Sequence, residues 1–307
     1  MPFFKRTMTV LNTAVQIITM KKLWYELKYL CESNRNGSRA TQSKRYRDLR
    51  GIAETLDKLG YRNMGSRSLK PKHVKALVDY WNSQSLSIGT IKTRMSVLRW
   101  WAGKVGRHNV IDRRNNHYGI GRRVYITAYS KACDVPNDTI RTIKDPYVSA
   151  SMQLAKAFGL RKEEAIKFNP VYADQGDHVR LKGSWCKGGR PRLIPVLTQV
   201  QRDLLDEVTR LVGANSLIPS NKTFIQQYKR YEEVARQLEL RGLHGLRHAY
   251  AQERYKQLTG RDCSHQGGMK YKQMDAEQKT LDRKARLIIS NELGHNRIDN
   301  VAIYIGA

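Results

Sequence analysis

Five short motifs in the second half of the chain carry cationic, proton-transferring or nucleophilic side chains. Each motif alone has an ordinary structural explanation, such as a solvated arginine, an exposed turn lysine, a buried histidine or a partly buried tyrosine. Their chemical meaning therefore depends on their occurring together and in order. The motifs are Gly159-Leu160-Arg161-Lys162-Glu163-Glu164, Cys186-Lys187-Gly188-Gly189-Arg190-Pro191-Arg192-Leu193-Ile194-Pro195, Leu243-His244-Gly245-Leu246-Arg247-His248-Ala249-Tyr250, Glu292-Leu293-Gly294-His295 and, nine residues after His295, Tyr304.

In this order the motifs resemble the tyrosine recombinase (phage integrase) family. Members of that family carry an arginine followed three residues later by an acid, a hairpin lysine, an H-x-x-R motif, a histidine or tryptophan in L-G-H, and a nucleophilic tyrosine nine residues further on. The matching residues here are Arg161 with Glu164, Lys187, His244 with Arg247, His295 and Tyr304. The spacing from His295 to Tyr304 is the most specific match, and by motif the resemblance spans residues 145–307.

The resemblance implies that Tyr304 attacks a DNA phosphodiester and forms a 3′-phosphotyrosyl link. Two arginine forks can hold the non-bridging phosphate oxygens and offset the charge of the transition state, and we expect Arg161 and Arg247 to do so. A phenol has a pKa of about 10 and needs help in losing its proton, so His244 is the expected base. His295 is expected to donate a further hydrogen bond to the phosphate.

The departing 5′-oxygen needs a proton, which Lys187 would supply as general acid from a mobile hairpin. Lys182 is a rival for this role, but the residues after Lys187 match the turn and strand of the family. Glu164 is expected to steady its own helix or a catalytic neighbour, and His248 to support the site or simply to pack. Because the covalent link conserves the bond energy, we expect no ATP, metal or other cofactor. The sequence shows neither a P-loop pattern nor an obvious cluster of metal ligands.

The chain carries 56 Lys and Arg against 27 Asp and Glu, a formal net charge of +29 over 307 residues. Self-repulsion of this size favours a polyanionic partner, and nucleic acid is the leading candidate. Residues 1–124 hold 26 basic and 7 acidic side chains, whereas residues 125–307 hold 30 and 20. The first part is therefore expected to be the main DNA clamp. Charge alone leaves open a ribosomal or chromatin-like protein, or a polybasic membrane binder.

The segment 87–101 predicts an amphipathic helix, because apolar residues recur at helical spacing while cations and a hydroxyl fall on another face. An ordinary surface helix with a solvated basic face is the alternative. Residues 104–123 are rich in arginine and glycine and have weak apolar periodicity, which predicts an exposed basic linker. The apolar face consists of Ile91, Met95, Leu98 and Ala102. The residues expected to bind DNA are Lys92, Arg94, Ser96, Arg99, Arg113, Arg114, Arg122 and Arg123.

The predicted fold is mainly α with a small antiparallel sheet. Helical patterning covers residues 20–105 and returns from about residue 138, with further helices at 199–212, 222–239 and 243–258. Two short strands near 179–181 and 193–196 flank a glycine-rich turn and predict a hairpin. The expected parts are an N-terminal extension (1–19), a helical core-binding domain that binds DNA (20–105), a basic linker (106–137) and an α+β catalytic domain (138–307).

Two features depart from the family's usual pattern. His295 lies 48 residues after Arg247, more than the family usually needs. The extra material at 258–286 predicts a solvent-exposed helical insertion, with a contact to DNA or to a neighbouring subunit as the alternative. Three residues follow Tyr304, where family members commonly continue into a tail that docks on a neighbour, so the coupling of subunits is open. No separate arm-binding domain is expected, because core-like helical sequence begins near residue 20.

The remaining signals point to a reduced protein outside the membrane. The cysteines form no C-x-x-C pair, which favours free thiols of a cytoplasmic protein over a zinc site or disulfides. The longest apolar stretch, residues 8–20, is too short and too polar to span a bilayer and lacks a signal-peptide cleavage site. The four cysteines are Cys31, Cys133, Cys186 and Cys263.

These observations predict a bacterial or phage-encoded site-specific recombinase or integrase that integrates or excises a mobile element. Its partners would be duplex DNA with specific recombination sites, three further copies of the chain in a tetramer, and accessory DNA-bending proteins. It would close as a C-shaped clamp around the duplex. A type IB topoisomerase-like enzyme that relaxes DNA as a monomer is the alternative enzyme. A DNA-binding regulator with a decayed catalytic domain is the other alternative, against which the intact set of catalytic residues argues.

Overall fold

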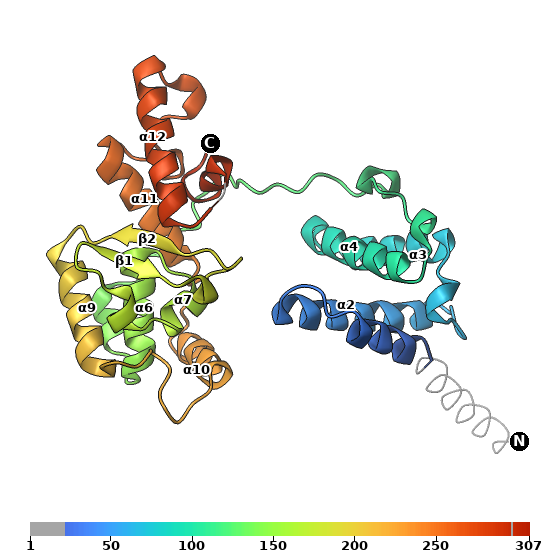
Figure 1. Cartoon of the computed structure of the whole chain (residues 1–307). Coiled ribbons are helices and arrows are strands. Elements are labelled where there is room, and N and C mark those ends of the chain that lie inside the picture. The colour runs from blue at the N-terminus through green and yellow to red at the C-terminus, as the bar shows by residue number, and fades with distance from the viewer. Residues whose placement is uncertain (1–21, 296) are drawn as a thin grey trace, which may run out of the picture. The chain divides into compact units, whose positions relative to one another are not determined.

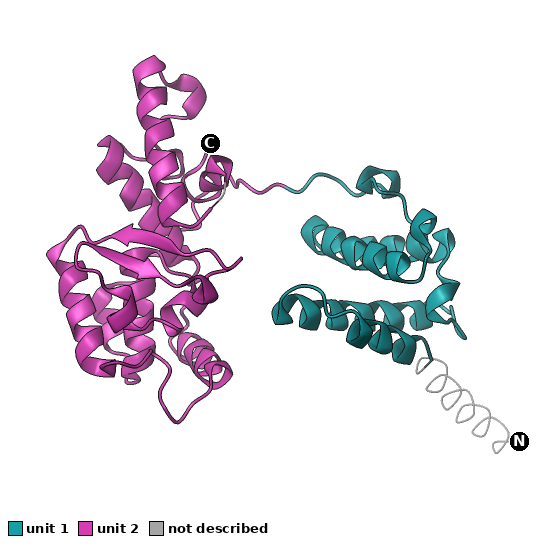
Figure 2. Cartoon of the chain, in the orientation of Figure 1, with its two compact units in different colours: residues 1–123 teal, residues 124–307 magenta. Residues whose placement is uncertain are grey.

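A computed structural model of the chain describes residues 22–295 and 297–307. It divides into two compact units, of which the first ends at Arg123 and the second runs from Val124 to Ala307 (Figures 1 and 2). The predicted N-terminal extension, residues 1–19, lies outside the described residues. Each unit has its own hydrophobic core.

The first unit is helical. Residues 22–33 form a helix, followed by α2 (Arg39–Lys58), α3 (Pro71–Ser83) and α4 (Ile88–Lys104). Serine side chains cap two of these helices, since the hydroxyl of Ser38 accepts from the amide of Thr41 and that of Ser87 from Thr90. The predicted apolar face of α4 is confirmed, because each of its four residues is buried. That face packs in a core that includes Trp81 and Trp101, both fully buried.

The segment after α4 packs on this same unit. It forms two short 3-10 turns, η2 (His108–Val110) and η3 (Asn115–Tyr118), and the side chains of Ile111 and Ile120 are buried in the first core. Arg99 of α4 ties the segment down, because its guanidinium donates to the carbonyl of Asp112 and to the side chain of Asn115. Residues 108–120 therefore belong structurally with the first unit, although their sequence predicts an exposed linker.

The second unit is a helical domain with one hairpin. Its first half contains α5 (Asn137–Arg141), α6 (Pro146–Phe158), α7 (Lys162–Ile166), α8 (Pro170–Ala173), β1 (His178–Leu181), η4 (Gly183–Trp185) and β2 (Arg192–Pro195). Its second half contains α9 (Gln199–Val212), α10 (Phe224–Gln237), α11 (Gly245–Thr259), η5 (Ser264–Gln266), η6 (Tyr271–Gln273), α12 (Ala276–Glu292), η7 (Ile298–Val301) and α13 (Ala302–Ile305). The mainly helical fold with a small antiparallel sheet is as predicted.

The two strands pair antiparallel, with Val179 opposite Ile194, and both of these side chains are fully buried. Alternate residues face outward, so the sheet is covered on one face, as expected for a short antiparallel hairpin. Helices α6 and α11 pass through the core beside the sheet (Figure 1). No helix among the described residues is long and apolar enough to cross a membrane.

The predicted insertion at 258–286 differs from expectation. Its last residues begin α12, where Asp282 and Ala285 are buried rather than exposed. The hydroxyl of Tyr255 donates to Asp282 at 2.8 Å, and Arg286 pairs with the same carboxylate at 2.7 Å. The prediction of a solvent-exposed insertion is therefore wrong for these positions, because one buried carboxylate holds α12 against α11.

Candidate active site

The predicted catalytic side chains converge in the second unit. Arg161 lies at the start of α7, His244 and Arg247 lie at the start of α11, and His295 follows α12. Their neighbour Tyr304 lies on α13. Distances to the ring centre of Tyr304 are 5.8 Å from the guanidinium carbon of Arg247, 6.1 Å from the ring of His244 and 5.4 Å from the ring of His295.

Glycine sets the position of the first arginine. Gly159 ends α6 in the left-handed region, at φ +59°, and a Cβ there would lie 2.6 Å from the ring of Tyr250. The chain turns and Arg161 becomes the N-cap of α7. Glu164 then accepts from the backbone amide of Arg161 at 2.7 Å and from its guanidinium at 2.8 Å. The acid three residues after the arginine thus fixes both the helix start and the position of the Arg161 guanidinium.

The second arginine is held by backbone carbonyls. Arg247 is 1% exposed, and its guanidinium donates to the carbonyls of Gly159 and Leu293. Arg161 donates to the same Leu293 carbonyl at 3.4 Å. Burial lowers the pKa of Arg247 to about 10, and the charge of Arg161 adds to this, so Arg247 stays cationic at neutral pH. Its Nε has no hydrogen-bond partner among the described residues.

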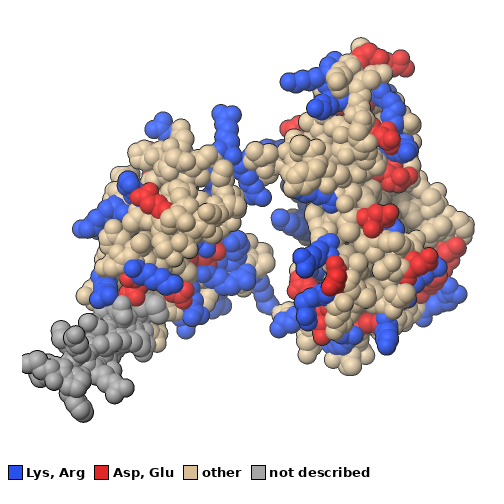
Figure 3. Space-filling model, turned by 180° about the vertical axis from the view of Figure 1, so that it is seen from behind, with Lys and Arg blue, Asp and Glu red and all other residues tan. Residues whose placement is uncertain are grey.

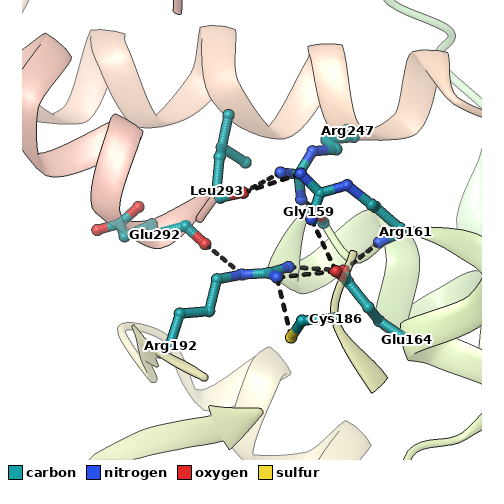
Figure 4. Close-up of polar contacts among 8 residues, drawn as sticks. All are labelled: Gly159, Arg161, Glu164, Cys186, Arg192, Arg247, Glu292 and Leu293. Carbon is teal, nitrogen blue, oxygen red and sulfur yellow. Dashed lines mark hydrogen bonds and ion pairs between the residues drawn. The ribbon is translucent and has the colours of Figure 1, made fainter. Parts of the chain in front are cut away.

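Arg192, which the motifs do not single out, is part of the same network (Figure 4). It lies on β2, is 7% exposed, and forms a two-bond ion pair with Glu164 at 2.8 and 2.6 Å. It also donates to the carbonyl of Glu292 and to the thiol of Cys186. The one signal for it in the sequence is its place in the hairpin, since it begins the strand after the predicted lysine turn.

The C-terminus of α12 is the common acceptor of this arginine cluster. Its last carbonyls, at Glu292 and Leu293, receive hydrogen bonds from Arg192, Arg161 and Arg247 (Figure 4). Carbonyls at a helix C-terminus carry partial negative charge, so they stabilise cations there. The carboxylate of Glu164 pairs with Arg161 and Arg192. One carboxylate against three guanidinium groups leaves an excess of positive charge suited to an anion.

Three histidines surround the ring of Tyr304, which is 5% exposed. The nearest is His248, with ring centres 4.5 Å apart. Burial, together with His244 and Lys131, lowers the pKa of His248 to about 4. Burial also lowers the pKa of His295 to about 4, with Arg247 and Arg161 contributing. Both rings are therefore neutral near pH 7, and Nε2 of His295 has no partner among the described residues.

His244 has a lowered pKa as well, through burial first and then through the charges of Arg247 and Arg161. A neutral ring at physiological pH can accept a proton. The charge of Lys187 adds a smaller contribution to the same lowering of the His244 pKa. Lys187 itself is exposed, in the turn between η4 and β2.

The hairpin turn closes tightly behind Lys187. Gly188 and Gly189 both adopt positive φ, at +85° and +72°, and a Cβ on Gly183 would lie 2.5 Å from the carbonyl oxygen of Gly189. The rival, Lys182, is exposed and lies 5.6 Å from the ring centre of Tyr172, outside this cluster. Of the two lysines, Lys187 is therefore the one whose charge acts on His244.

The residues predicted to bind DNA fall into two groups. Arg113, Arg114, Arg122 and Arg123 are exposed, as is Ser96. Arg94 stacks over Trp81 at 5.4 Å, and Arg99 is committed to the segment after α4, while Lys92 is half-buried. Figure 3 shows basic side chains over both units, with acidic side chains among them.

The lowered pKa of Glu164 predicts that the stability of the fold depends on pH in acid. Burial would raise its pKa, but the hydrogen bonds and charge of Arg192, with Arg161 and Arg247, outweigh burial and lower the pKa to about 2. Because the pKa of Glu164 is lower in the folded protein, its carboxylate stabilises the fold at pH values above the ordinary pKa of 4.5. This stabilisation is lost as the pH falls towards 2. We expect Glu164→Gln to lower the free energy of unfolding at pH 7 by about 3 kcal/mol, measured by urea unfolding.

The matched control is the neighbouring carboxylate Glu163, which is exposed and pairs with Lys167. Glu163→Gln should shift stability by less than about 0.5 kcal/mol. The difference between Glu164→Gln and the parent protein should shrink between pH 4 and pH 2. A constant difference across that range would show that the loss comes from packing rather than from the carboxylate charge.

Two family models match the sequence of this chain. The family model described as "Phage integrase, N-terminal" matches residues 20–111, and the model described as "Integrase" matches residues 121–253. Fold and site thus define a tyrosine site-specific recombinase. The chain belongs to the tyrosine recombinase (phage integrase) family. The second match ends before His295 and Tyr304, whose assignment depends on spacing and on the geometry above. No curated protein sequence matches the chain.

Solved structures share the fold at low sequence identity. A lambda integrase (75–356) dimer bound to a COC′ core site has a TM-score of 0.60 at 14% identity, with 92% of this chain and 93% of that chain covered. XerH recombinase on palindromic difH has a TM-score of 0.58 at 18% identity, with 92% and 80% covered. The Tn1549 transposon integrase (aa 82–397) with circular intermediate DNA has a TM-score of 0.56 at 14% identity, with 93% and 95% covered.

The chemistry of the site can be stated from the side chains present. Among residues 22–295 and 297–307, no group of three or more His, Cys, Asp or Glu side chains is placed to hold a metal ion. The cluster consists of arginines, neutral histidines and one buried tyrosine. Such a set can bind an anionic ester, remove a proton from a phenol and stabilise added negative charge.

Proposed function

We propose that this chain cleaves and rejoins duplex DNA through a 3′-phosphotyrosyl intermediate, with Tyr304 as the nucleophile, during integration or excision of a bacterial or phage mobile element. The observation that carries the proposal is the enclosure of one tyrosine by Arg247 and three histidines. A structural tyrosine has no need of such neighbours. Here they supply charge and proton acceptors on several sides of the ring.

In the proposed step, the oxygen of Tyr304 forms a bond to phosphorus and the bond from phosphorus to the 5′-oxygen breaks. His244 takes the phenol proton, and Lys187 gives a proton to the departing 5′-oxygen. Arg161 and Arg247 hold the non-bridging oxygens and offset the charge gained at the transition state. Rejoining runs the same transfers in reverse, so bond energy is conserved and strand exchange needs no outside energy source.

His295 and His248 have supporting roles in this proposal. The unpartnered Nε2 of His295 is available to donate a hydrogen bond to a phosphate oxygen. His248 packs against the ring of Tyr304 and limits its rotation. Glu164, with Arg192, keeps Arg161 in place without touching DNA.

DNA is the proposed partner, and recombination would involve four protomers on two sites. The structures of lambda integrase, XerH and the Tn1549 integrase are DNA complexes, and one is a lambda integrase tetramer on a Holliday junction. The net charge of +29 supports the same partner for this chain. Accessory DNA-bending proteins remain part of the proposal.

A covalent adduct tests this function. The protein is incubated with nicked suicide duplexes that carry sequence flanking its own gene, and the products are separated on a denaturing gel. We expect a protein–DNA adduct in which the 3′-phosphate is blocked and a free 5′-hydroxyl is released. Absence of adduct on every flanking sequence contradicts the proposal. Efficient relaxation of supercoiled DNA without any defined site would favour the topoisomerase alternative.

The DNA clamp makes a separate prediction about salt. Replacing the exposed Arg113, Arg114 and Arg122 by glutamine should weaken DNA binding and lower the slope of log K against log salt by about 2–3 units, measured by fluorescence anisotropy. Each arginine that neutralises a phosphate releases about one counterion. The change in slope therefore measures how many phosphates these three arginines neutralise.

The control removes the same charge elsewhere. Arg50, Lys75 and Lys256 lie outside the residues predicted to bind DNA and are ion-paired with Glu54, Asp79 and Asp262. Replacing all three by glutamine should therefore leave the slope within about one unit. Equal slopes for the two triple variants would contradict the placement of phosphate contacts at residues 113–122.

A further inference from the structure

The chain segment that carries Tyr304 is held by residues of the predicted insertion. The carbonyl of Ala307 accepts from the hydroxyl of Ser264 at 3.1 Å, and the carbonyl of Gly306 accepts from Arg286 at 3.0 Å. Gly306 packs so closely that a Cβ there would lie 2.3 Å from the Ser264 hydroxyl. The insertion is therefore a receptor for the end of α13 rather than a free loop.

His265 contacts the backbone of the nucleophile itself. Its Nδ1 lies 3.0 Å from the carbonyl oxygen of Tyr304, and its Nε2 lies 3.0 Å from the carbonyl oxygen of Thr127. Both partners are acceptors, so each contact needs a hydrogen on the imidazole; a neutral ring satisfies one of them and a protonated ring both. Gln252 of α11 donates to the same Tyr304 carbonyl at 2.9 Å. The carbonyl oxygen of Tyr304 therefore uses both of its lone pairs.

These contacts matter because α13 cannot fix itself. It is four residues long, from Ala302 to Ile305, and a single helical turn has too few internal hydrogen bonds to be stable alone. A misplacement of about 1 Å at a reacting group can cost about 100-fold in rate. The carbonyl of Tyr304 lies on the residue that must be placed, so an anchor there acts directly on the position of its ring.

We propose that residues 260–275 form a clamp, within the same chain, that positions the nucleophile, and that His265 is its positioning residue. The Nδ1 atom of His265 contacts the carbonyl of Tyr304, and the Nε2 atom contacts the carbonyl of Thr127. Thr127 lies just after Val124, where the second unit begins. The proposal rests on the proposed role of Tyr304. It gives the segment between Arg247 and His295 a task in catalysis, without direct contact between His265 and the DNA.

Variants of His265 separate the hydrogen bond at Nδ1 from the one at Nε2. An asparagine amide can replace the hydrogen bond made by Nδ1, and a glutamine amide can replace the one made by Nε2. We expect His265→Phe to lower the single-turnover cleavage rate constant at saturating protein by at least about tenfold, with the DNA dissociation constant within about twofold. His265→Asn should restore most of the rate, and His265→Gln should restore little. The substrate is the suicide duplex used for the adduct.

The matched control is Thr209→Val, which removes one local side-chain hydrogen bond within α9 and touches neither residues 260–275 nor residues 304–307. It should keep the rate constant, since a merely destabilising change lowers the fraction of protein that cleaves and not the rate of the fraction that does. A wild-type rate constant in His265→Phe, or equal rescue by Asn and Gln, overturns the clamp. Failure of wild type to form any adduct instead overturns the proposed function, and Tyr304→Phe confirms that the signal measured is the adduct.

Discussion

The Tyr304→Phe variant is expected to form no covalent adduct with DNA while binding it as tightly as the parent protein. The change removes one oxygen and keeps the ring, which is 5% exposed and packs on His248. The fold should therefore survive, with a melting temperature within a few degrees. The adduct is measured on a denaturing gel with the suicide duplex, and affinity is measured by anisotropy on the intact duplex.

The control for this loss is an exposed tyrosine in the same unit. Tyr129 is 66% exposed, and Tyr129→Phe should form adduct at the parental rate. An adduct of parental yield in Tyr304→Phe would move the nucleophile to another residue and would also remove the basis for a positioning role of His265. Loss of DNA binding together with loss of adduct would show instead that the substitution damages the fold.

The side chains of this site were predictable because each has a chemical identity and a fixed spacing. Arg161 with Glu164, the H-x-x-R pair and the interval from His295 to Tyr304 are all visible in one sequence, and the structure brings them together. The hairpin was predictable for a similar reason, since a glycine-rich turn lies between two short apolar strands.

The groups that hold the proposed catalytic side chains were not predictable, because most are backbone atoms. The carbonyls of Gly159, Glu292 and Leu293 bind three arginines, and any residue type presents a carbonyl. Arg192 has a visible type, but its partner Glu164 is 28 residues away and already has a local role. His265 is hidden in the same way, since both of its partners are carbonyls far along the chain.

The end of the first unit could not be predicted from the spacing of apolar residues. Residues 108–120 contain isolated apolar side chains, Ile111 and Ile120, which no helical or strand pattern connects. Both nonetheless enter the first core, because Arg99 holds the intervening turns by the Asp112 carbonyl. A composition rich in arginine and glycine predicts exposure, which holds for the arginines of this segment. It does not predict the burial of Ile111 and Ile120, against whose core Val110 and Tyr118 also pack.

Replacement of Arg161 should separate catalysis from stability. Arg161 shares Glu164 with Arg192, and its side chain is 21% exposed. In Arg161→Ala the carboxylate of Glu164 keeps its two-bond pair with Arg192, so we expect a smaller loss of stability than in Glu164→Gln. The cleavage rate constant should fall by about 100- to 1,000-fold, because one preorganised donor to the phosphate is gone. Urea unfolding and single-turnover cleavage measure the two effects.

The choice of replacement shows whether charge or geometry matters. Arg161→Lys keeps the charge but loses the planar fork, so it should recover a fraction of the rate and remain well below the parent. Arg247→Ala is the contrast, since it removes the arginine donor of the Gly159 carbonyl and one of the two arginine donors of the Leu293 carbonyl in a buried site. It should lose stability as well as rate. On a duplex with a neutral methylphosphonate at the scissile position, the deficit of Arg161→Ala should shrink, because less charge has to be offset. An undiminished deficit there would mean that Arg161 orients the DNA rather than stabilising charge.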